Sequence, residues 1–146
     1  MSGQKLYGVA DFPLADTAGQ DLPGQRGRVL AELTLEGVQS GALGLEDFAI
    51  TPMALLAQAG IARDAGRAML AANFERAAEL VAVPQEVIME LYELLRPGRA
   101  SGAGQIRARA EEMRRDYGAV KLAEFLENAA LHYQRRGLIG EGESGA

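Results

Sequence analysis

The sequence lacks cysteine and tryptophan, and it contains a single histidine, His132, among 146 residues. The absence of cysteine excludes disulfide scaffolds, thiol catalysis, iron–sulfur clusters and zinc sites built from thiolates. One histidine forms no histidine-pair metal site and leaves one candidate base for a serine triad. Aromatic residues make up only 5% of the chain. Because apolar ligand pockets are usually lined by aromatic and large aliphatic side chains, a self-contained enzyme with a deep pocket is disfavoured.

Long apolar runs and an excess of basic residues are also missing. The longest uncharged run, Phe48–Ala62, has 15 residues and contains Pro52 and Gln58. A membrane span needs about 20 apolar residues, and the N-terminus lacks the apolar core of a secretory signal. The formal net charge is −5, which opposes binding to a phosphate backbone. We therefore expect a cytoplasmic protein that binds neither nucleic acid nor a membrane.

The chain divides into parts of unlike pattern. Residues 1–50 are punctuated by glycine and proline without a sustained period, so we expect an irregular N-terminal arm with short helical turns. Residues 51–138 are predicted to form a helical domain, and residues 139–146 a flexible tail of small polar residues.

Three local patterns stand out in the arm. Thr34 is a candidate N-cap for a short helix that reaches about residue 40. Leu45–Phe48 is a candidate for another single turn. Pro13 disfavours helical backbone at the residue before it, so we expect an extended run over Val9–Leu14.

Apolar residues spaced three and four apart predict helices after the arm. Thr51 as N-cap and proline at the next position begin a first long pattern that continues to about Val81. Gly60 and Gly66 weaken the middle of this helix and mark a bend or a close crossing.

Three further helices follow. The second begins with Pro84 at its first position and ends at residues 97–98. The third shows its apolar pattern from Ile106 to Tyr117, before a break or bend at Gly118, and the fourth shows its pattern from Leu122 to Tyr133, with a left-handed cap at Gly137. Because the connections are short, neighbouring helices should be antiparallel. The expected fold class is all-α, an open antiparallel bundle of three to four helices with the irregular arm.

The candidates for catalysis or cofactor binding have simpler explanations. His132 lies beside the apolar stripe of the fourth helix, which is more typical of a partly packed side chain than of an acid–base group. Glutamate pairs at 75/79 and 86/90 share helix faces, but alanine at position 129 removes the Glu-x-x-His pattern of di-metal bundles. Glycines at 98, 102 and 104 match no phosphate loop. We predict no catalytic, cofactor-binding or metal-binding residue on this chain.

Two polar residues, Arg63 and Asn73, fall inside the apolar stripe of the first long helix. A charge in such a stripe is costly unless it is paired. One explanation is an intramolecular partner, a carboxylate for Arg63 and a backbone carbonyl for Asn73. The other is a stripe that packs on another protein, to which these two residues supply specific hydrogen bonds. The residues alone favour neither explanation.

Several blocks of the sequence resemble one known family. The blocks are Asp11–Ala15, Thr34–Val38, Ile50–Pro52, Ile61–Arg67, Asn73–Leu80 and Val83–Pro84, followed by a looser match at Tyr117, Phe125, Ala129, Ala130 and Tyr133. In this order they resemble the small (gamma) subunit of adenosylcobalamin-dependent diol and glycerol dehydratases, over about residues 10–138. The resemblance implies an all-α subunit on the outside of the large subunit, without a catalytic residue of its own.

The resemblance also implies partners and a reaction. The family assembles two copies each of a large (alpha), a medium (beta) and a small subunit, and adenosylcobalamin lies between the large and medium subunits. The enzyme converts a 1,2-diol or glycerol to an aldehyde and water. This chain would then support the large catalytic subunit and holoenzyme assembly. The alternative is a helical adaptor or structural module of another assembly.

Two departures from the family pattern matter. Encapsulated members often carry an N-terminal extension, whereas this chain begins ten residues before its Asp11–Ala15 block. This favours a cytosolic enzyme, with a bacterial microcompartment as the less favoured location. In addition, Gly104 stands where the family has the acid of a capping box, so we expect the third helix to start late or fray.

The resemblance shifts the balance on the polar residues toward a subunit interface. Arginine suits such contacts because its planar fork pairs with carboxylates through two hydrogen bonds. The residues predicted to face the large subunit are Asp11, Phe12, Pro13, Leu14, Arg63, Arg67, Asn73 and Arg76.

Overall fold

The computed structural model describes residues 5–139, and every regular element in that part of the chain is helical. This confirms the predicted all-α class. The chain forms two compact units, Met1–Val81 and Ala82–Ala146, which are described separately below. The open bundle of the whole chain and the division at residue 50 stay predictions. The predicted tail lies outside the described residues except for Ile139.

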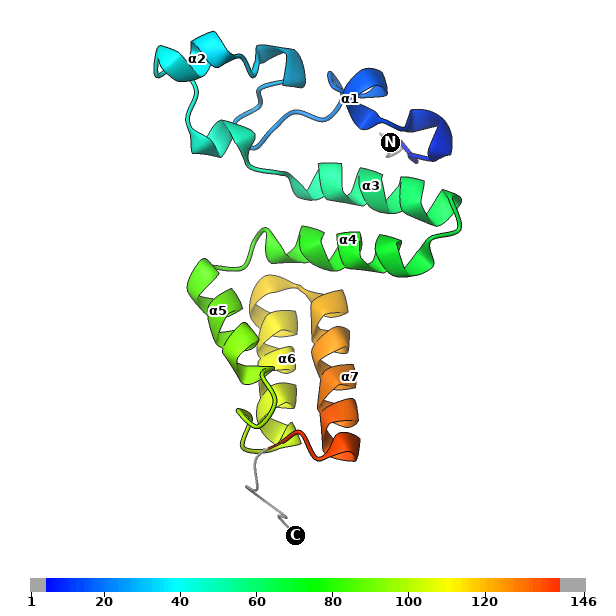
Figure 1. Cartoon of the computed structure of the whole chain (residues 1–146), viewed down its shortest axis with the longest axis vertical. Coiled ribbons are helices and arrows are strands. Elements are labelled where there is room, and N and C mark those ends of the chain that lie inside the picture. The colour runs from blue at the N-terminus through cyan, green and yellow to red at the C-terminus, as the bar shows by residue number, and fades with distance from the viewer. Residues whose placement is uncertain (1–4, 140–146) are drawn as a thin grey trace. The chain divides into compact units, whose positions relative to one another are not determined.

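A pair of antiparallel helices forms the centre of the first unit (Figure 1). Helix α3, Pro52–Asp64, begins as predicted, because the Thr51 hydroxyl accepts a hydrogen bond from the Ala54 N–H at 3.2 Å and proline occupies the first position. Helix α4, Ala68–Leu80, returns alongside it. Small side chains let the helix axes come close. The core between the helices consists of Ala59, Ala62 and Ala71, with Leu70 and Phe74 packed against it.

The prediction of one long helix to Val81 is wrong, because the chain reverses at residues 65–67. Gly66 has a φ of +75°, in the left-handed region that ends helices. The N–H groups of Gly66 and Arg67 donate to the carbonyls of Arg63 and Ala62, at 3.0 and 2.8 Å, and satisfy the last turn of α3. The apolar period runs on because both helices bury one face, and a period does not reveal a reversal.

Gly60 marks a close approach of the arm rather than a helix crossing. A Cβ atom at this position would lie 2.6 Å from the Tyr7 carbonyl oxygen. One turn later, the Asp64 carboxylate accepts the N–H of Val9 at 2.8 Å. A Cβ atom on Gly8 would lie 2.7 Å from the same carboxylate. The start of the arm is therefore held directly against α3.

The arm consists of short helical turns, as predicted. They are η1 (Val9–Asp11), α1 (Leu14–Thr17), η2 (Leu30–Glu32), α2 (Leu35–Gln39) and η3 (Leu45–Phe48). Thr34 caps α2 by accepting the Gly37 N–H at 3.1 Å, and η3 is the expected turn. The extended run over Val9–Leu14 is wrong, since only residues 12 and 13 are extended between η1 and α1. Proline constrains its immediate predecessor, not the whole run.

Asp47 is the one charged residue that is buried within residues 5–139. Its carboxylate accepts the Gly44 N–H at 2.8 Å and pairs with Arg26 at 3.2 Å and with Arg28 at 3.4 Å. A buried charge is tolerated only when it is paired and hydrogen-bonded. These contacts join residues 24–28 to η3, so Asp47 fixes the second half of the arm.

The second unit contains α5 (Gln85–Leu94), α6 (Ala103–Tyr117) and α7 (Val120–Arg136). Helices α6 and α7 form an antiparallel hairpin that turns at Gly118, where φ is +62° (Figure 1). The Tyr133 hydroxyl on α7 donates to the Leu95 carbonyl just after α5, at 2.5 Å. The buried side chains of the hairpin are Ile106, Ala110, Met113, Ala119, Leu122, Ala123, Leu126 and Ala130.

The ends of these helices test the predicted boundaries. Pro84 is the N-cap of α5 rather than its first residue, so the helix begins one position later than predicted. Helix α6 begins at Ala103, one position later than a capping box on Ser101 would place it, which agrees with the expected late start. The Gln105 side-chain oxygen accepts the N–H of Ser101 at 2.9 Å. Glutamine replaces the missing acid one position further along. The left-handed cap at Gly137 is confirmed, with φ +64°.

Replacing Gly60 with alanine tests the contact between the arm and α3. In an ordinary helix this change stabilises by up to about 1 kcal/mol. Here the new Cβ meets backbone, and we expect a net loss of about 1–2 kcal/mol from overpacking. Gly104→Ala is the matched helical control, because nothing lies within 4 Å of its Cβ position. Urea unfolding followed by circular dichroism measures both, and equal gains in stability would contradict the contact.

Replacing Asp47 with asparagine tests the buried carboxylate. The variant keeps the shape of the side chain but removes the charge that Arg26 and Arg28 face. We expect a loss of about 1.5–3 kcal/mol, the usual range for hydrogen bonds to a charged group, and faster proteolysis of the arm. Exposed Asp16→Asn is the control, with a change within about 0.5 kcal/mol. An arm that stays as protected in both variants would refute this role.

Candidate functional site

Within residues 5–139, no group of three or more histidine, aspartate or glutamate residues is placed to hold a metal ion. His132 is exposed on α7, so the expectation that it is partly packed is wrong. Glu75 and Glu90, from the two carboxylate pairs, form ion pairs with Arg63 and Arg109. No helix of the described part is long and apolar enough to cross a membrane.

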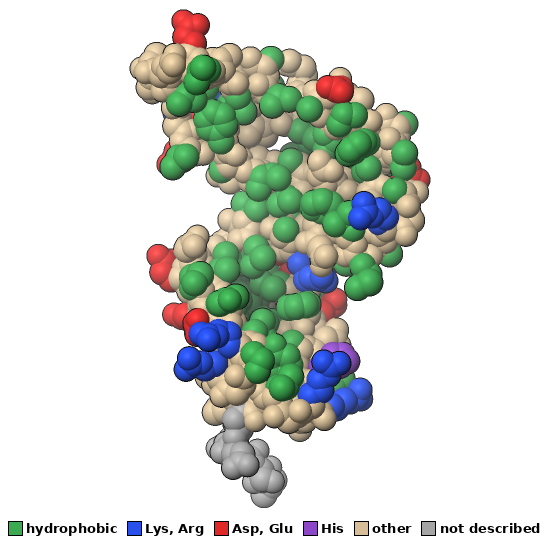
Figure 2. Space-filling view, in the orientation of Figure 1, with side chains coloured by type: hydrophobic (Ala, Val, Ile, Leu, Met, Phe, Trp, Pro, Cys, Tyr) green, Lys and Arg blue, Asp and Glu red, His purple; other side chains and the backbone are tan. Residues whose placement is uncertain are grey.

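The surface of the first unit is instead rich in large apolar side chains (Figure 2). Leu6, Leu45 and Met69 are 93%, 92% and 85% exposed. Contiguous apolar surface that remains in water commonly marks a site of protein association. The large apolar side chains of the first unit that are exposed are Leu6, Val9, Phe12, Leu30, Leu35, Val38, Leu45, Phe48, Ile50, Met53, Leu56 and Met69. Most lie in the arm, where the absence of a period gave sequence reasoning no signal.

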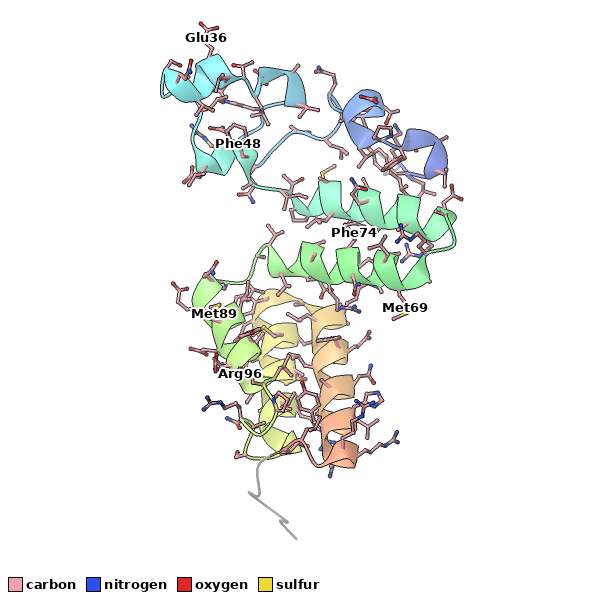
Figure 3. All side chains as sticks on the ribbon, in the orientation of Figure 1. Glu36, Phe48, Met69, Phe74, Met89 and Arg96 are labelled. Carbon is pink, nitrogen blue, oxygen red and sulfur yellow. The ribbon has the colours of Figure 1, made fainter. Side chains whose placement is uncertain are left out.

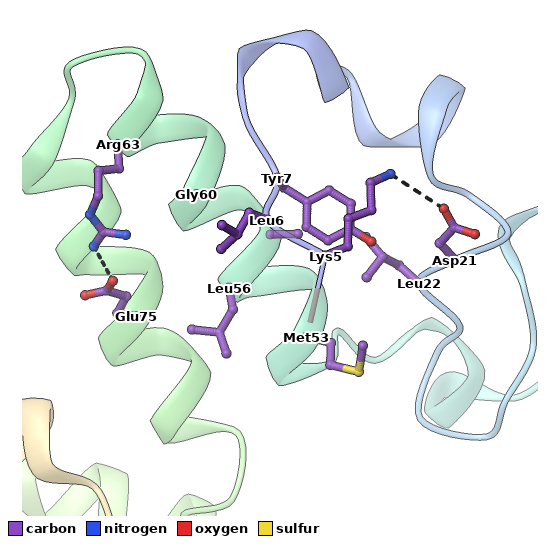
Figure 4. A pocket seen from close by; sticks show the side chains of 11 residues that line it. Lys5, Leu6, Tyr7, Asp21, Leu22, Met53, Leu56, Gly60, Arg63 and Glu75 are labelled. Atoms are coloured by element: carbon purple, nitrogen blue, oxygen red, sulfur yellow. Dashed lines mark hydrogen bonds and ion pairs between the residues drawn. The ribbon is translucent and has the colours of Figure 1, made fainter. Parts of the chain in front are cut away.

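A groove of about 630 Å³ lies between the arm and helices α3 and α4, and is called the arm groove below (Figure 4). Its walls are largely apolar, from Leu6, Tyr7, Leu22, Met53 and Leu56. Ion pairs lie among the lining residues: Lys5 with Asp21 at 3.8 Å, and Arg63 with Glu75. The groove can accept apolar side chains from another molecule.

A second hollow, of about 360 Å³, is called the Phe12 pocket below. It joins the arm, α3 and the start of α4, and its lining residues are Val9, Phe12, Gln58, Ile61, Ala62, Ala65, Arg67, Leu70 and Phe74. Figure 3 shows Phe74 between the two helices. The pocket brings together Phe12 and Arg67, two predicted interface residues that are 55 positions apart in the sequence.

The structure places the polar pair of the stripe on the surface. Arg63 is 57% exposed and forms an ion pair with Glu75, the intramolecular carboxylate that one explanation required. Asn73 is exposed, and its side-chain oxygen accepts a hydrogen bond from Arg76. The expected bond from the Asn73 amide group to a backbone carbonyl stays a prediction. Neither residue is inside the core. The predicted stripe assumed one continuous helix, whereas the chain reverses at Gly66.

Four residues of the predicted interface, Asp11–Leu14, lie near the start of the arm, where Asp11 makes local contacts. The Asp11 carboxylate accepts the Gly8 N–H at 3.0 Å and lies 3.3 Å from the Lys5 ammonium. Phe12 and Pro13 are exposed, and Leu14 is half-buried. That all eight predicted residues contact a large subunit stays a prediction.

The hydrogen bond from the Gly8 N–H, helped by Lys5, lowers the pKa of Asp11 below its ordinary value. A lowered pKa in the folded state means that the charged form is favoured by the fold. The stabilising effect is therefore present above the ordinary pKa of aspartate and is lost as the pH falls through the lowered value. At neutral pH the Asp11 carboxyl is charged, so its bond from the Gly8 N–H contributes to holding the start of the arm.

Comparisons with known proteins identify the family. The family model described as dehydratase small subunit matches residues 7–140. The propanediol dehydratase small subunits of Citrobacter freundii and of Salmonella typhimurium strain LT2 are each 42% identical over 134 residues. The match covers 91% of this chain and 77% of each relative. The chain therefore belongs to the dehydratase small subunit family, as the blocks of its sequence indicated.

Proposed function

We propose that this chain is the non-catalytic small subunit of a coenzyme-B12-dependent dehydratase that converts a 1,2-diol or glycerol to an aldehyde and water. Its role is to support the large catalytic subunit and the assembly of the holoenzyme, with two copies of each subunit. The names of the two relatives make propane-1,2-diol the first substrate to test. The observation that carries the proposal is the apolar surface of the first unit, which a subunit would bury and an independent protein would leave in water.

The proposal assigns adenosylcobalamin to the large and medium subunits. When bound there, the cofactor supplies the radical chemistry that removes hydrogen from the diol. Within residues 5–139, the walls of the arm groove and the Phe12 pocket are mainly apolar and present no group of metal ligands. In this proposal, the residues of this chain act by binding a neighbouring subunit, not by contacting the reacting atoms.

Burial of the exposed apolar side chains would stabilise an interface with another subunit. Complete burial of one large aliphatic side chain contributes roughly 1.5–3 kcal/mol. Leu6, Leu45 and Met69 are almost fully exposed, so an interface that covers the arm has several such contributions available. Association also costs several kcal/mol of lost freedom, so a stable contact needs more than one of these side chains.

Reconstitution by omission tests the function. The matching large and medium subunits are mixed with adenosylcobalamin and propane-1,2-diol, and aldehyde formation is followed with and without this chain. We expect activity or soluble assembly to depend on the chain, because it covers apolar surface of the complex. An unrelated helical protein at equal concentration is the control. Equal activity and equal assembly without the chain would reject the proposal and favour an adaptor of another assembly.

Arg63→Ala separates an interface role from an internal one. Arg63 is 57% exposed, so loss of its ion pair with Glu75 should change the unfolding free energy of the isolated chain by less than about 1 kcal/mol. If Arg63 faces the large subunit, affinity for the large and medium subunits falls by about tenfold, the equivalent of 1.4 kcal/mol. Arg96→Ala, which breaks an exposed pair with Glu93, is the matched control. An unchanged affinity would remove Arg63 from the interface.

A further inference from the structure

The Phe12 pocket has preformed walls. Ala62 belongs to the buried core between α3 and α4, while Leu70 and Phe74 pack against that core from the other helix. The arm side of the pocket is pinned to α3, because the Asp64 carboxylate accepts the Val9 N–H at 2.8 Å. A pocket whose walls are already ordered binds a partner without the entropic cost of ordering those walls.

The walls themselves remain in water. Phe12 is 64% exposed and Val9 is 50% exposed, although both line the pocket. A free small molecule that filled about 360 Å³ would leave the outer faces of these side chains uncovered. A protein segment inserts one side chain into the pocket and covers the outer faces with its neighbours. The geometry therefore fits a segment of another chain.

Arg67 is the one charged residue that lines the pocket. The structure holds this arginine by its backbone: its N–H donates to Ala62 and its carbonyl accepts from Ala71. The other predicted interface cations are engaged, Arg63 with Glu75 and Arg76 with Asn73. Across residues 5–139, no carboxylate forms an ion pair with Arg67. Its guanidinium therefore lies at an apolar pocket and can pair with an anionic group of a partner.

We propose that the Phe12 pocket accepts a segment of the large subunit in which a large apolar side chain lies next to an aspartate or glutamate. The apolar side chain fills the space between Phe12, Ile61 and Phe74. The carboxylate pairs with the guanidinium of Arg67, whose planar fork accepts it through two hydrogen bonds. The proposal rests on the proposed function for the identity of the partner, and it adds the chemistry that the partner must present.

Two variants test the two halves of this recognition. Arg67→Glu reverses the charge, and Ala65→Phe places a ring at an exposed lining position whose backbone (φ −77°, ψ 6°) accepts it. Their matched controls are Arg135→Glu and Ala108→Phe, at exposed positions of α7 and α6. Circular dichroism and thermal unfolding first establish that all four fold like the wild type. Affinity for the purified large and medium subunits is then measured at low and high salt.

We expect each pocket variant to weaken binding by about tenfold or more, and each control to bind within about twofold of the wild type. The neutral variant Arg67→Ala should also flatten the salt dependence, because salt screens a partly exposed ion pair. If the wild type binds the subunits and the pocket variants bind them with equal affinity, the proposed role of the pocket is wrong, while the proposed function still holds. A wild type that does not bind the subunits overturns both.

Sedimentation of the chain alone tests the other occupant, a second copy of this chain. We expect the wild type and Arg67→Glu to sediment alike as monomers. Self-association of the wild type that Arg67→Glu abolishes would overturn the assignment to the large subunit.

Discussion

The first unit depends on the small side chains of α3, which let backbone approach the helix from two directions. Ala59 and Ala62 meet Ala71 of α4, and Gly60 receives the Tyr7 carbonyl of the arm. Figure 1 shows α3 between these two neighbours. A larger residue at these positions would push away either α4 or the arm. The arm groove and the Phe12 pocket lie where these three segments meet.

Charge plays two different roles in the chain. The buried carboxylate of Asp47 joins distant parts of the arm. Burial lowers the local dielectric, so each of its ion pairs and hydrogen bonds is stronger than on the surface. The ion pairs on the outside of α5, α6 and α7, such as Arg96 with Glu93, are half exposed and contribute little to stability. An arginine on the surface is therefore better placed for recognition than for folding, and Arg67 illustrates this at the mouth of an apolar pocket.

In the proposed function, this dehydratase small subunit acts through its surface. The first unit supplies that surface: apolar turns of the arm, a groove between the arm and the helix pair, and a pocket with one available cation. The buried alanines of α3 and α4 pack against Leu70 and Phe74, two of the side chains that line the pocket. Nine of the exposed large apolar side chains of this unit lie within residues 1–50.

The sequence by itself determined the all-α class, the caps at Thr34, Thr51 and Gly137, and the family, since these depend on neighbouring residues and on blocks of local sequence. It also determined that no histidine or cysteine pair is available for a metal. Tertiary structure decided where the chain reverses at Gly66, because apolar periodicity is the same on both sides of a turn. It decided that Arg63 is on the surface and that Phe12 and Arg67 line one pocket. The physical reason is that the arm packs against α3 through contacts between residues about 50 positions apart, which no local pattern encodes.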